Sequence, residues 1–436
     1  MLVVHVVVDQ LRADMLDRYR DVFTEGLDRL LEDGLVVAGA SHRHSETTTA
    51  VGHATLVTGV VPARHGIVGN TWWERTPDGT LVSVYAVADS TSPLLGLPGA
   101  AGRSPSYLLR GGLPDWILAR DSDARVVSLS TKDRAAITMA GRAPGHVYWL
   151  ESDRFVTSEH YRGSYPDWVE SFNAERMPAL VGDSVWQQEV PSGFRSLARP
   201  DPAAYEGDAV HTVFPHLRRQ EAAAGDRGRF LWVREWTPWP DRAVLELADR
   251  AVDELALGRR GVVDYLGLSF SQTDYVGHQY GPLSQEQLDN LYRLDRTLGE
   301  LIDMLDRRVG AGRWVLGLSS DHGVLTAPEW LEAQGETARR LTRDELRGLR
   351  ATALEAANRG GDARAIQDRV VAAVESLDFV DRVYRASELE ARSQAGDTIA
   401  GLFLSARRED RLTGSLAAFG LHLVYEPNVL ARPGTG

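Results

Sequence analysis

Short runs of apolar, mostly β-branched residues recur along the chain, and polar residues bound each run. Four runs stand out: LVVHVVV at 2–8, RVVSLS at 125–130, VDYLGLSF at 263–270 and WVLGLSS at 314–320. Continuous apolarity without alternation is typical of strands that are buried on both faces. The pattern therefore predicts an α/β fold with a mostly parallel central sheet and helices on both faces.

Helical periodicity is strongest between the last two runs. One stripe there holds Leu288, Leu291, Leu294, Leu298, Leu301, Ile302 and Leu305, which predicts an amphipathic helix that faces the core and carries no chemistry. Residues 336–376 are rich in Arg, Ala and Glu, and we expect helices with a solvated face there.

Segments 71–122 and 138–258 contain more Gly, Pro and Trp and show weaker periodicity. We expect loops and small elements over the sheet, with 138–258 as a cap-like insertion inside a single domain that spans 1–436. Within it, WVREWTPWPDRA (232–243) could form an aromatic substrate platform, but tryptophans beside prolines more often pack a loop down, and we favour packing.

Polar residues follow each of the four predicted strands. Because ligands of open parallel sheets bind beyond the carboxyl ends of the strands, these side chains are expected at one edge. Asp274 and His278 are four residues apart and share a helical face, so they can hold one ion. Oxygen and nitrogen donors of this kind suit zinc, and two metal ions about 4 Å apart are a recurring device for displacing a group from phosphorus. The residues are Asp9 after the first run, Lys132 and Arg134 after the second, Asp274 and His278 after the third, and Asp321 and His322 after the fourth.

The stretch SETTTAVGHATLVTG (45–59) offers a nucleophile. Its small and polar residues predict a loop that enters a helix, which places a hydroxyl near Thr49 at the positive N-terminal end. Coordination to a metal would lower the pKa of that hydroxyl further. The alternative is that the threonines only cap the helix, and spacing alone does not dismiss Ser45, Thr47 or Thr48.

Composition narrows the choice of partners. The net charge of −13 argues against nucleic acid and anionic membranes. The absence of cysteine excludes disulfides and thiolate chemistry, and no apolar run reaches the roughly 18 residues of a membrane span. A protein of this net charge that binds an anionic substrate must concentrate positive charge locally. Lys132 is the one lysine among 48 basic residues. Every other basic residue is arginine.

Together, five stretches resemble the alkaline phosphatase superfamily, and specifically its phosphate-irrepressible branch, which is related to the type I phosphodiesterase/nucleotide pyrophosphatases. They are VVVDQLRADMLDRY, TTAVGHATLVTGVVPARHGIVGNTWW, SLSTKDRAAI, SFSQTDYVGHQYGP and SSDHG, and they occur in the family's order over nearly the whole chain.

The resemblance implies a zinc-dependent alkaline phosphatase that hydrolyses small-molecule phosphate monoesters through a phosphothreonine. By it, Asp9, Asp321, His322 and the nucleophile Thr49 hold one zinc, and Asp274 and His278 hold the other. Asn70 donates to a phosphoryl oxygen, and His53 is structural. Lys132 and Arg134 match the basic pair that separates this monoesterase branch from its diesterase relatives, and an ammonium is more compact than a guanidinium.

The sequence departs from the family at its C-terminus. The family's second zinc takes a third ligand from a T-H-G stretch, and the chain ends at ARPGTG where that stretch should begin; His422 precedes it in a predicted strand. We expect a truncated sequence. The alternatives are a non-catalytic fragment that binds one metal and phosphate, and a phosphodiesterase/nucleotide pyrophosphatase.

Location and assembly follow only from the resemblance. It implies export to the periplasm or secretion, although the start MLVVHVVVDQ predicts a strand and not a signal peptide. We rank a missing N-terminal segment above a cytoplasmic enzyme, and we expect a monomer.

Overall fold

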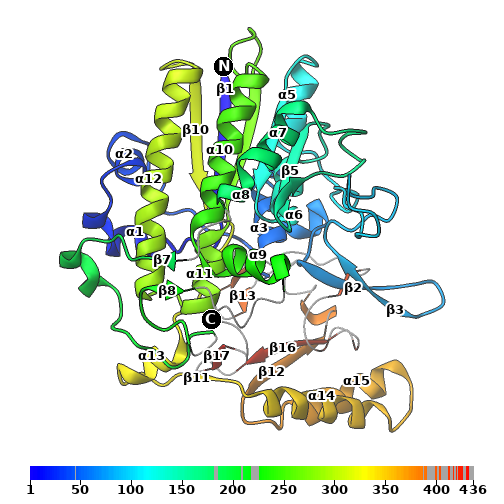
Figure 1. Cartoon of the computed structure of the whole chain (residues 1–436). Coiled ribbons are helices and arrows are strands. Elements are labelled where there is room, and N and C mark those ends of the chain that lie inside the picture. Colours follow the sequence, from blue (N-terminus) through cyan, green and yellow to red (C-terminus); the bar gives the residue numbers. More distant parts are fainter. Residues whose placement is uncertain are drawn as a thin grey trace.

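A six-stranded sheet forms the centre of the molecule (Figure 1). The structure, a computed structural model, describes residues 1–44, 46–180, 185–207, 210–217, 225–385 and 387–389, with short segments between 398 and 431. The first five strands of the sheet are parallel and the sixth is antiparallel to the fifth, which confirms the predicted α/β fold. In order across the sheet they are β10 (Trp314–Ser319), β1 (Leu2–Val8), β9 (Asp264–Phe270), β4 (Val126–Ser130), β5 (His146–Glu151) and β6 (Arg154–Val156).

Helices connect these strands and cover the sheet. The seven apolar positions predicted as one stripe, from Leu288 to Leu305, are all buried on a single helix, so the predicted core-facing amphipathic helix is confirmed. Helices also occur within 336–376, as predicted. The bounds are α1 (Ala13–Arg18), η1 (Arg20–Val22), α2 (Gly26–Asp33), α3 (Thr49–Thr58), α4 (Pro62–His65), α5 (Leu113–Arg120), α6 (Asp133–Met139), α7 (Asp167–Glu175), α8 (Met177–Leu180), η2 (Ser192–Leu197), α9 (Gly225–Trp236), α10 (Trp239–Glu254), α11 (Gln272–Tyr280), α12 (Gln285–Arg308), α13 (Pro328–Ala333), α14 (Arg343–Ala357) and α15 (Ala363–Val374).

Burial on both faces explains the unbroken apolar runs of the strands. On one face, α10 and α12 pack against side chains such as Val6 and Leu268. On the other, α5 packs against Tyr265 and α6 packs against Val147. The parallel arrangement puts the carboxyl ends of β1, β4, β9 and β10 at one edge, toward the lower half of Figure 1.

A second hydrophobic cluster lies between the helices α14 and α15 and the strands β12 (Val380–Arg385) and β16 (Leu421–Tyr425), at the bottom of Figure 1. Among the described residues, no helix is both long and apolar enough to cross a bilayer. The remaining strands are β2 (Thr71–Arg75), β3 (Leu81–Tyr85), β7 (Val185–Trp186), β8 (His216–Leu217), β11 (Arg339–Arg340), β13 (Thr398–Ile399), β14 (Leu402–Phe403), β15 (Arg411–Leu412) and β17 (Val429–Ala431). His422 lies on β16, as expected.

The predicted cap-like insertion at 138–258 is too wide. Strands β5 and β6 belong to the central sheet, and α10 packs in its core. The Gly, Pro and Trp content that suggested an insertion lies mostly in the connections between these elements, whereas the strand HVYWLE itself has a buried centre. In the stretch 232–243, Trp232 packs edge-on against Trp239, with ring centroids 5.8 Å apart, which agrees with packing rather than a platform.

Helix α3 touches the turn after β10 backbone to backbone. A Cβ added at Gly52 would lie 2.2 Å from the carbonyl oxygen of Asp321 and 2.6 Å from its Cβ. Only glycine allows this approach. The contact fixes the first turns of α3 beside the end of β10.

We expect Gly52→Ala to lower the free energy of unfolding by about 1–3 kcal/mol, because the added methyl group has no space. Gly317→Ala on β10 is the matched control, since nothing lies within 4 Å of its Cβ position, and we expect it to change stability by less than about 0.5 kcal/mol. Urea unfolding followed by circular dichroism measures both. Equal stability of the two variants would contradict the close contact.

Candidate active site

Residues from three strand ends meet at one buried ammonium. Asp9 follows β1, Lys132 follows β4 and Asp274 lies on α11 after β9. The Nζ of Lys132 donates to Asp9 Oδ2 at 2.7 Å and also to Asp274 Oδ2. All three residues are 5% exposed or less. One ammonium therefore joins the carboxylates of two sequence regions that lie more than two hundred positions apart.

The other oxygen of each carboxylate faces an imidazole. Asp9 Oδ1 lies 3.3 Å from His322 Nε2, and Asp274 Oδ1 lies 3.2 Å from His278 Nε2. Asp321, from the end of β10, brings its Oδ2 to 3.6 Å from the same nitrogen of His322. Ligands of a tetrahedral zinc with bonds of about 2.0 Å are about 3.3 Å apart. The spacings therefore suit two neighbouring zinc positions.

Buried oxygen atoms in this cluster lack strong donors. Asp9 Oδ1 and Asp321 Oδ2 accept no well-aligned hydrogen bond from the described residues. Asp9 and Asp274 share a single ammonium, and Asp321 lies beside two imidazoles. Buried carboxylates need cations or donors. The oxygen and nitrogen donors of Asp9, Asp274 and His322, which converge within 4.8 Å, therefore fit a metal ion.

The cluster is electrostatically held in its charged form. Burial alone would raise the pKa of Asp274, but Lys132 and then His278 hold it well below its usual range. Burial would likewise raise the pKa of Asp321, but His53 and His322 keep it low. For His322 the balance runs the other way: burial would lower its pKa, and the negative charge of Asp321 and Asp9 raises it to about 10.

Thr49 is the first residue of α3 and is 3% exposed. The preceding Thr48 is the N-cap residue but makes no side-chain cap bond to the helix, so capping does not explain Thr48. Asn70 accepts a hydrogen bond from the backbone N–H of Ala50 at 2.8 Å through its Oδ1. Its amide nitrogen therefore remains a donor beside the start of α3. Thr47 is exposed, and Ser45 lies outside the described residues.

Sequence reasoning does not identify Gln10, and it identifies His53 only as a structural residue. The Nδ1 of His53 lies 2.8 Å from Thr49 O and 3.0 Å from Asp321 Oδ2, which ties the first turn of α3 to that carboxylate. The side chain of Gln10 donates to Asp274 Oδ1 at 2.7 Å, and its backbone N–H donates to Asp321 Oδ1 at 3.0 Å. The position of Gln10 directly after Asp9 was the one available signal.

Arg134 stands beside the cluster but is held by tyrosine. Its Nη1 lies 3.5 Å from the hydroxyl of Tyr85, which donates to Asp133 at 2.5 Å. Burial would lower the pKa of Arg134, and the nearby Tyr85 and Tyr275 raise it. The ring of Tyr275 also lies 4.8 Å from Lys132 Nζ. Strand β3 thus positions the second basic residue.

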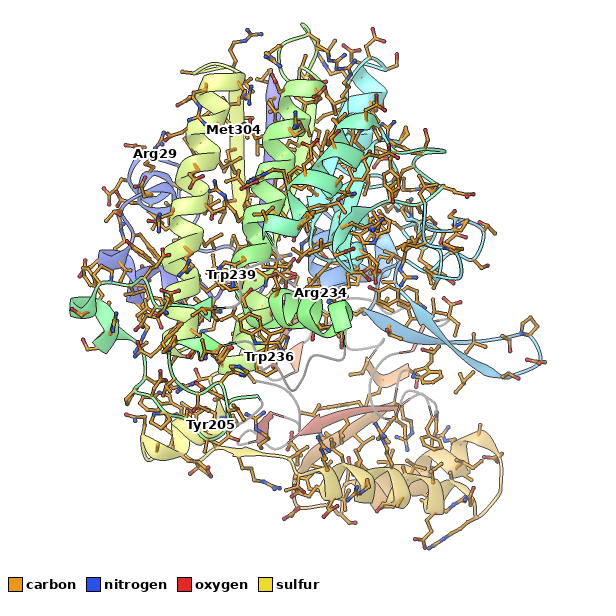
Figure 2. All side chains as sticks on the ribbon, in the orientation of Figure 1. Arg29, Tyr205, Arg234, Trp236, Trp239 and Met304 are labelled. Atoms are coloured by element: carbon orange, nitrogen blue, oxygen red, sulfur yellow. The ribbon has the colours of Figure 1, made fainter. Side chains whose placement is uncertain are left out.

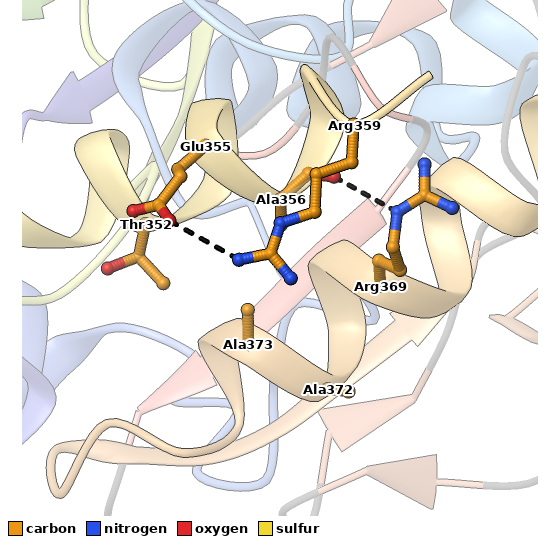
Figure 3. A pocket seen from close by; sticks show the side chains of 7 residues that line it. All are labelled: Thr352, Glu355, Ala356, Arg359, Arg369, Ala372 and Ala373. Atoms are coloured by element: carbon orange, nitrogen blue, oxygen red, sulfur yellow. Dashed lines mark hydrogen bonds and ion pairs between the residues drawn. The ribbon is translucent and has the colours of Figure 1, made fainter. Parts of the chain in front are cut away.

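A groove between α14 and α15 offers no comparable chemistry (Figure 3). It measures about 370 Å³ and is lined by Thr352, Glu355, Ala356, Arg359, Arg369, Ala372 and Ala373. Glu355 pairs with Arg359 at 3.3 Å, and Arg369 Nε donates to Ala356 O at 3.2 Å. Its charged side chains thus pair with each other or with backbone, and the candidate site is the one at the sheet edge.

Known proteins resemble the chain over most of its length. The model of the type I phosphodiesterase/nucleotide pyrophosphatase family matches residues 3–413. Alkaline phosphatase PafA of Elizabethkingia meningoseptica is 33% identical over 338 residues, which are 76% of this chain and 61% of that protein. Alkaline phosphatase PhoV of Synechococcus elongatus is 34% identical over 338 residues, 76% of this chain and 60% of that protein.

A solved structure agrees in fold. The crystal structure of wild-type alkaline phosphatase PafA superimposes with a TM-score of 0.85 at 26% identity, covering 99% of this chain and 86% of that one. The chain spans about three fifths of the length of the curated relatives that it matches.

In metal-free protein kept in EDTA, His322 should contribute less to the free energy of unfolding as pH rises. Its folded pKa, about 10, is above the ordinary 6.5, so its contribution is complete below pH 6.5 and is lost as pH rises through 10. We expect the difference in unfolding free energy between wild type and His322→Gln to shrink over that interval in EDTA. Urea titrations at several pH values measure it, and a difference that grows with pH would refute the charge balance described above.

Proposed function

Because the chain belongs to the type I phosphodiesterase/nucleotide pyrophosphatase family and shares the fold of alkaline phosphatase PafA, we propose that it hydrolyses phosphate monoesters with two zinc ions and a threonine nucleophile. The observation that carries this proposal is the buried Lys132 ammonium between Asp9 and Asp274. It puts a compact positive charge where two sets of ligands adjoin.

Each set of ligands pairs carboxylate with imidazole. Asp9, Asp321 and His322, together with Thr49, would hold one zinc, and Asp274 and His278 would hold the other. When bound, zinc would polarise phosphoryl oxygens and lower the pKa of a hydroxyl or a water. His278 is half-exposed, with 46% of its side chain accessible, so the second position is the more open of the two.

The chain's own residues supply the nucleophile and the phosphate grip. The Thr49 hydroxyl oxygen would attack phosphorus as the bond to the leaving oxygen breaks, and water would then displace threonine from the phosphoryl group. The start of α3 favours negative charge at this point. Asn70 would donate its amide to one phosphoryl oxygen, and Lys132 and Arg134 would hold the others.

The charge of the pocket favours monoesters over the diesters that the family description also covers. A monoester is a dianion and a diester a monoanion. One extra unit charge at about 4 Å from a cation is worth on the order of 4 kcal/mol at an effective dielectric constant near 20. Lys132 and Arg134 together therefore support the monoesterase over the phosphodiesterase. We also propose export to the periplasm or secretion, which rests on the resemblance alone.

Lys132→Arg should lower kcat/KM for an aryl phosphate by about 100-fold although the charge is unchanged. Lys132 is 2% exposed and is bounded by two carboxylates and by the Tyr275 ring, and a planar guanidinium needs more space. The reverse exchange Arg142→Lys, at an exposed position, is the control and should keep wild-type kinetics. Wild-type efficiency in Lys132→Arg would defeat the steric explanation.

Metal analysis tests the two ligand sets. We expect close to two zinc ions per chain together with phosphate release, and about one in Asp274→Asn. Asp303→Asn, on an exposed carboxylate of α12 that pairs with Arg29, should keep both ions. At most one zinc in the wild type, without phosphate release, would instead favour the non-catalytic fragment.

A further inference from the structure

A second acidic cluster lies apart from the residues discussed above. Asp201 and Glu206 lie on the loop after η2, and Glu286 lies in the first turn of α12. Each offers a carboxylate oxygen within 4.8 Å of the others. Glu206 is 3% exposed and Glu286 is fully buried.

Among the residues that the structure describes, the neighbours of this cluster do not balance its charge when all three carboxylates are ionised. Arg199 pairs with Glu206 and lies 3.5 Å from Asp201 Oδ1. Three carboxylates facing one guanidinium leave two negative charges. Glu286 Oε1 lies 2.8 Å from His216 Nε2. However, the Oε2 atoms of both Glu206 and Glu286 are buried and have no hydrogen-bond partner among the described residues.

Protonation would also relieve the repulsion between these carboxylates. Burial, followed by the charge of Glu286, raises the pKa of Asp201 to about 7 and that of Glu206 to about 8. Both values are far above those of ordinary carboxyl groups. The burial of two carboxylate oxygens without a partner among the described residues, in a cluster of three carboxylates, therefore indicates a missing positive charge.

We propose that Asp201, Glu206 and Glu286 bind a calcium ion. All the donors are hard oxygen atoms, and calcium takes six to eight oxygens at about 2.3–2.6 Å, which accommodates oxygens as far apart as those found here. A divalent ion neutralises the two excess negative charges. Magnesium demands tighter octahedral geometry at about 2.0–2.1 Å, so it fits a spread set of three carboxylates less well.

The location gives the ion a structural role. The loop that carries Asp201 and Glu206 is bonded to the corner between α11 and α12: Arg199 donates to Tyr280 O at 2.8 Å, and Gly207 N–H donates to Gln279 O at 2.7 Å. Figure 2 labels Tyr205 on this loop, near the lower end of α12. Helix α11 carries Asp274 and His278, so the ion would brace the helix that holds half of the zinc site.

Thermal unfolding of the zinc-loaded protein tests the proposal. Saturating calcium should raise Tm by about 3 °C or more in the wild type and leave Glu286→Gln unchanged. Without calcium, Glu286→Gln should be at least as stable as the wild type, because it loses a repelling charge. Glu300→Gln, an exposed position on the same helix, should respond to calcium like the wild type. If Glu286→Gln does not fold, Asp201→Asn takes its place.

Terbium reports the site independently of stability. Tb³⁺ substitutes for Ca²⁺, and its emission should be sensitised by Trp186, whose ring centroid lies 5.5 Å from that of His216. Calcium should displace it, and Glu286→Gln should abolish the signal while keeping its zinc. An unchanged wild-type Tm in calcium, an equal response of Glu286→Gln, or a response to magnesium alone would overturn the proposal. Wild-type protein that binds calcium as expected but does not hydrolyse phosphate monoesters would contradict only the proposed zinc mechanism.

Discussion

The ion pair of Lys132 with Asp9 and Asp274 is the interaction on which the arrangement of the sheet edge depends. It joins the ends of β1, β4 and β9 at a point that water hardly reaches. Without a positive charge there, carboxylates gathered by three parallel strands would repel one another in a medium that screens poorly. An ammonium suits this position because it is small and can donate to several oxygens at once. A protein of net charge −13 thereby places its one lysine between two carboxylates.

The two acidic clusters resolve the same electrostatic problem differently. Around Lys132, an ammonium and neighbouring imidazoles hold the pKa values of Asp274 and Asp321 low. Around Glu286, the guanidinium of Arg199 does not offset the burial of Glu206 and the charge of Glu286, so the pKa of Glu206 rises. The carboxylates of the first cluster are therefore ionised, the form in which they bind a metal ion. The second has one guanidinium for three carboxylates, and its loop is bonded to the corner of α11 and α12.

Local patterns in the sequence predicted the strands and the residues at their carboxyl ends, because burial on both faces leaves an unbroken apolar run. The N-terminal position of Thr49 on α3 was equally local. The limits of the insertion were not predictable in this way, since composition averaged over 138–258 hid the strand at 146–151. Contacts of Gln10 and His53 depend on strand order and on the approach of α3 to β10, neither of which has a motif. Asp201, Glu206 and Glu286 are brought together only by the tertiary fold.

The proposal that Thr49 is the phosphorylated residue can be tested directly, because mass spectrometry locates the phosphoryl group. Zinc-loaded protein mixed with an aryl phosphate and quenched in acid during turnover should carry phosphate on the peptide that contains Thr49, and Thr49→Ala should carry none. Turnover by the wild type with phosphate on a different residue, or undiminished turnover by Thr49→Ala, would contradict the central claim that these strand ends form a phosphatase with a threonine nucleophile.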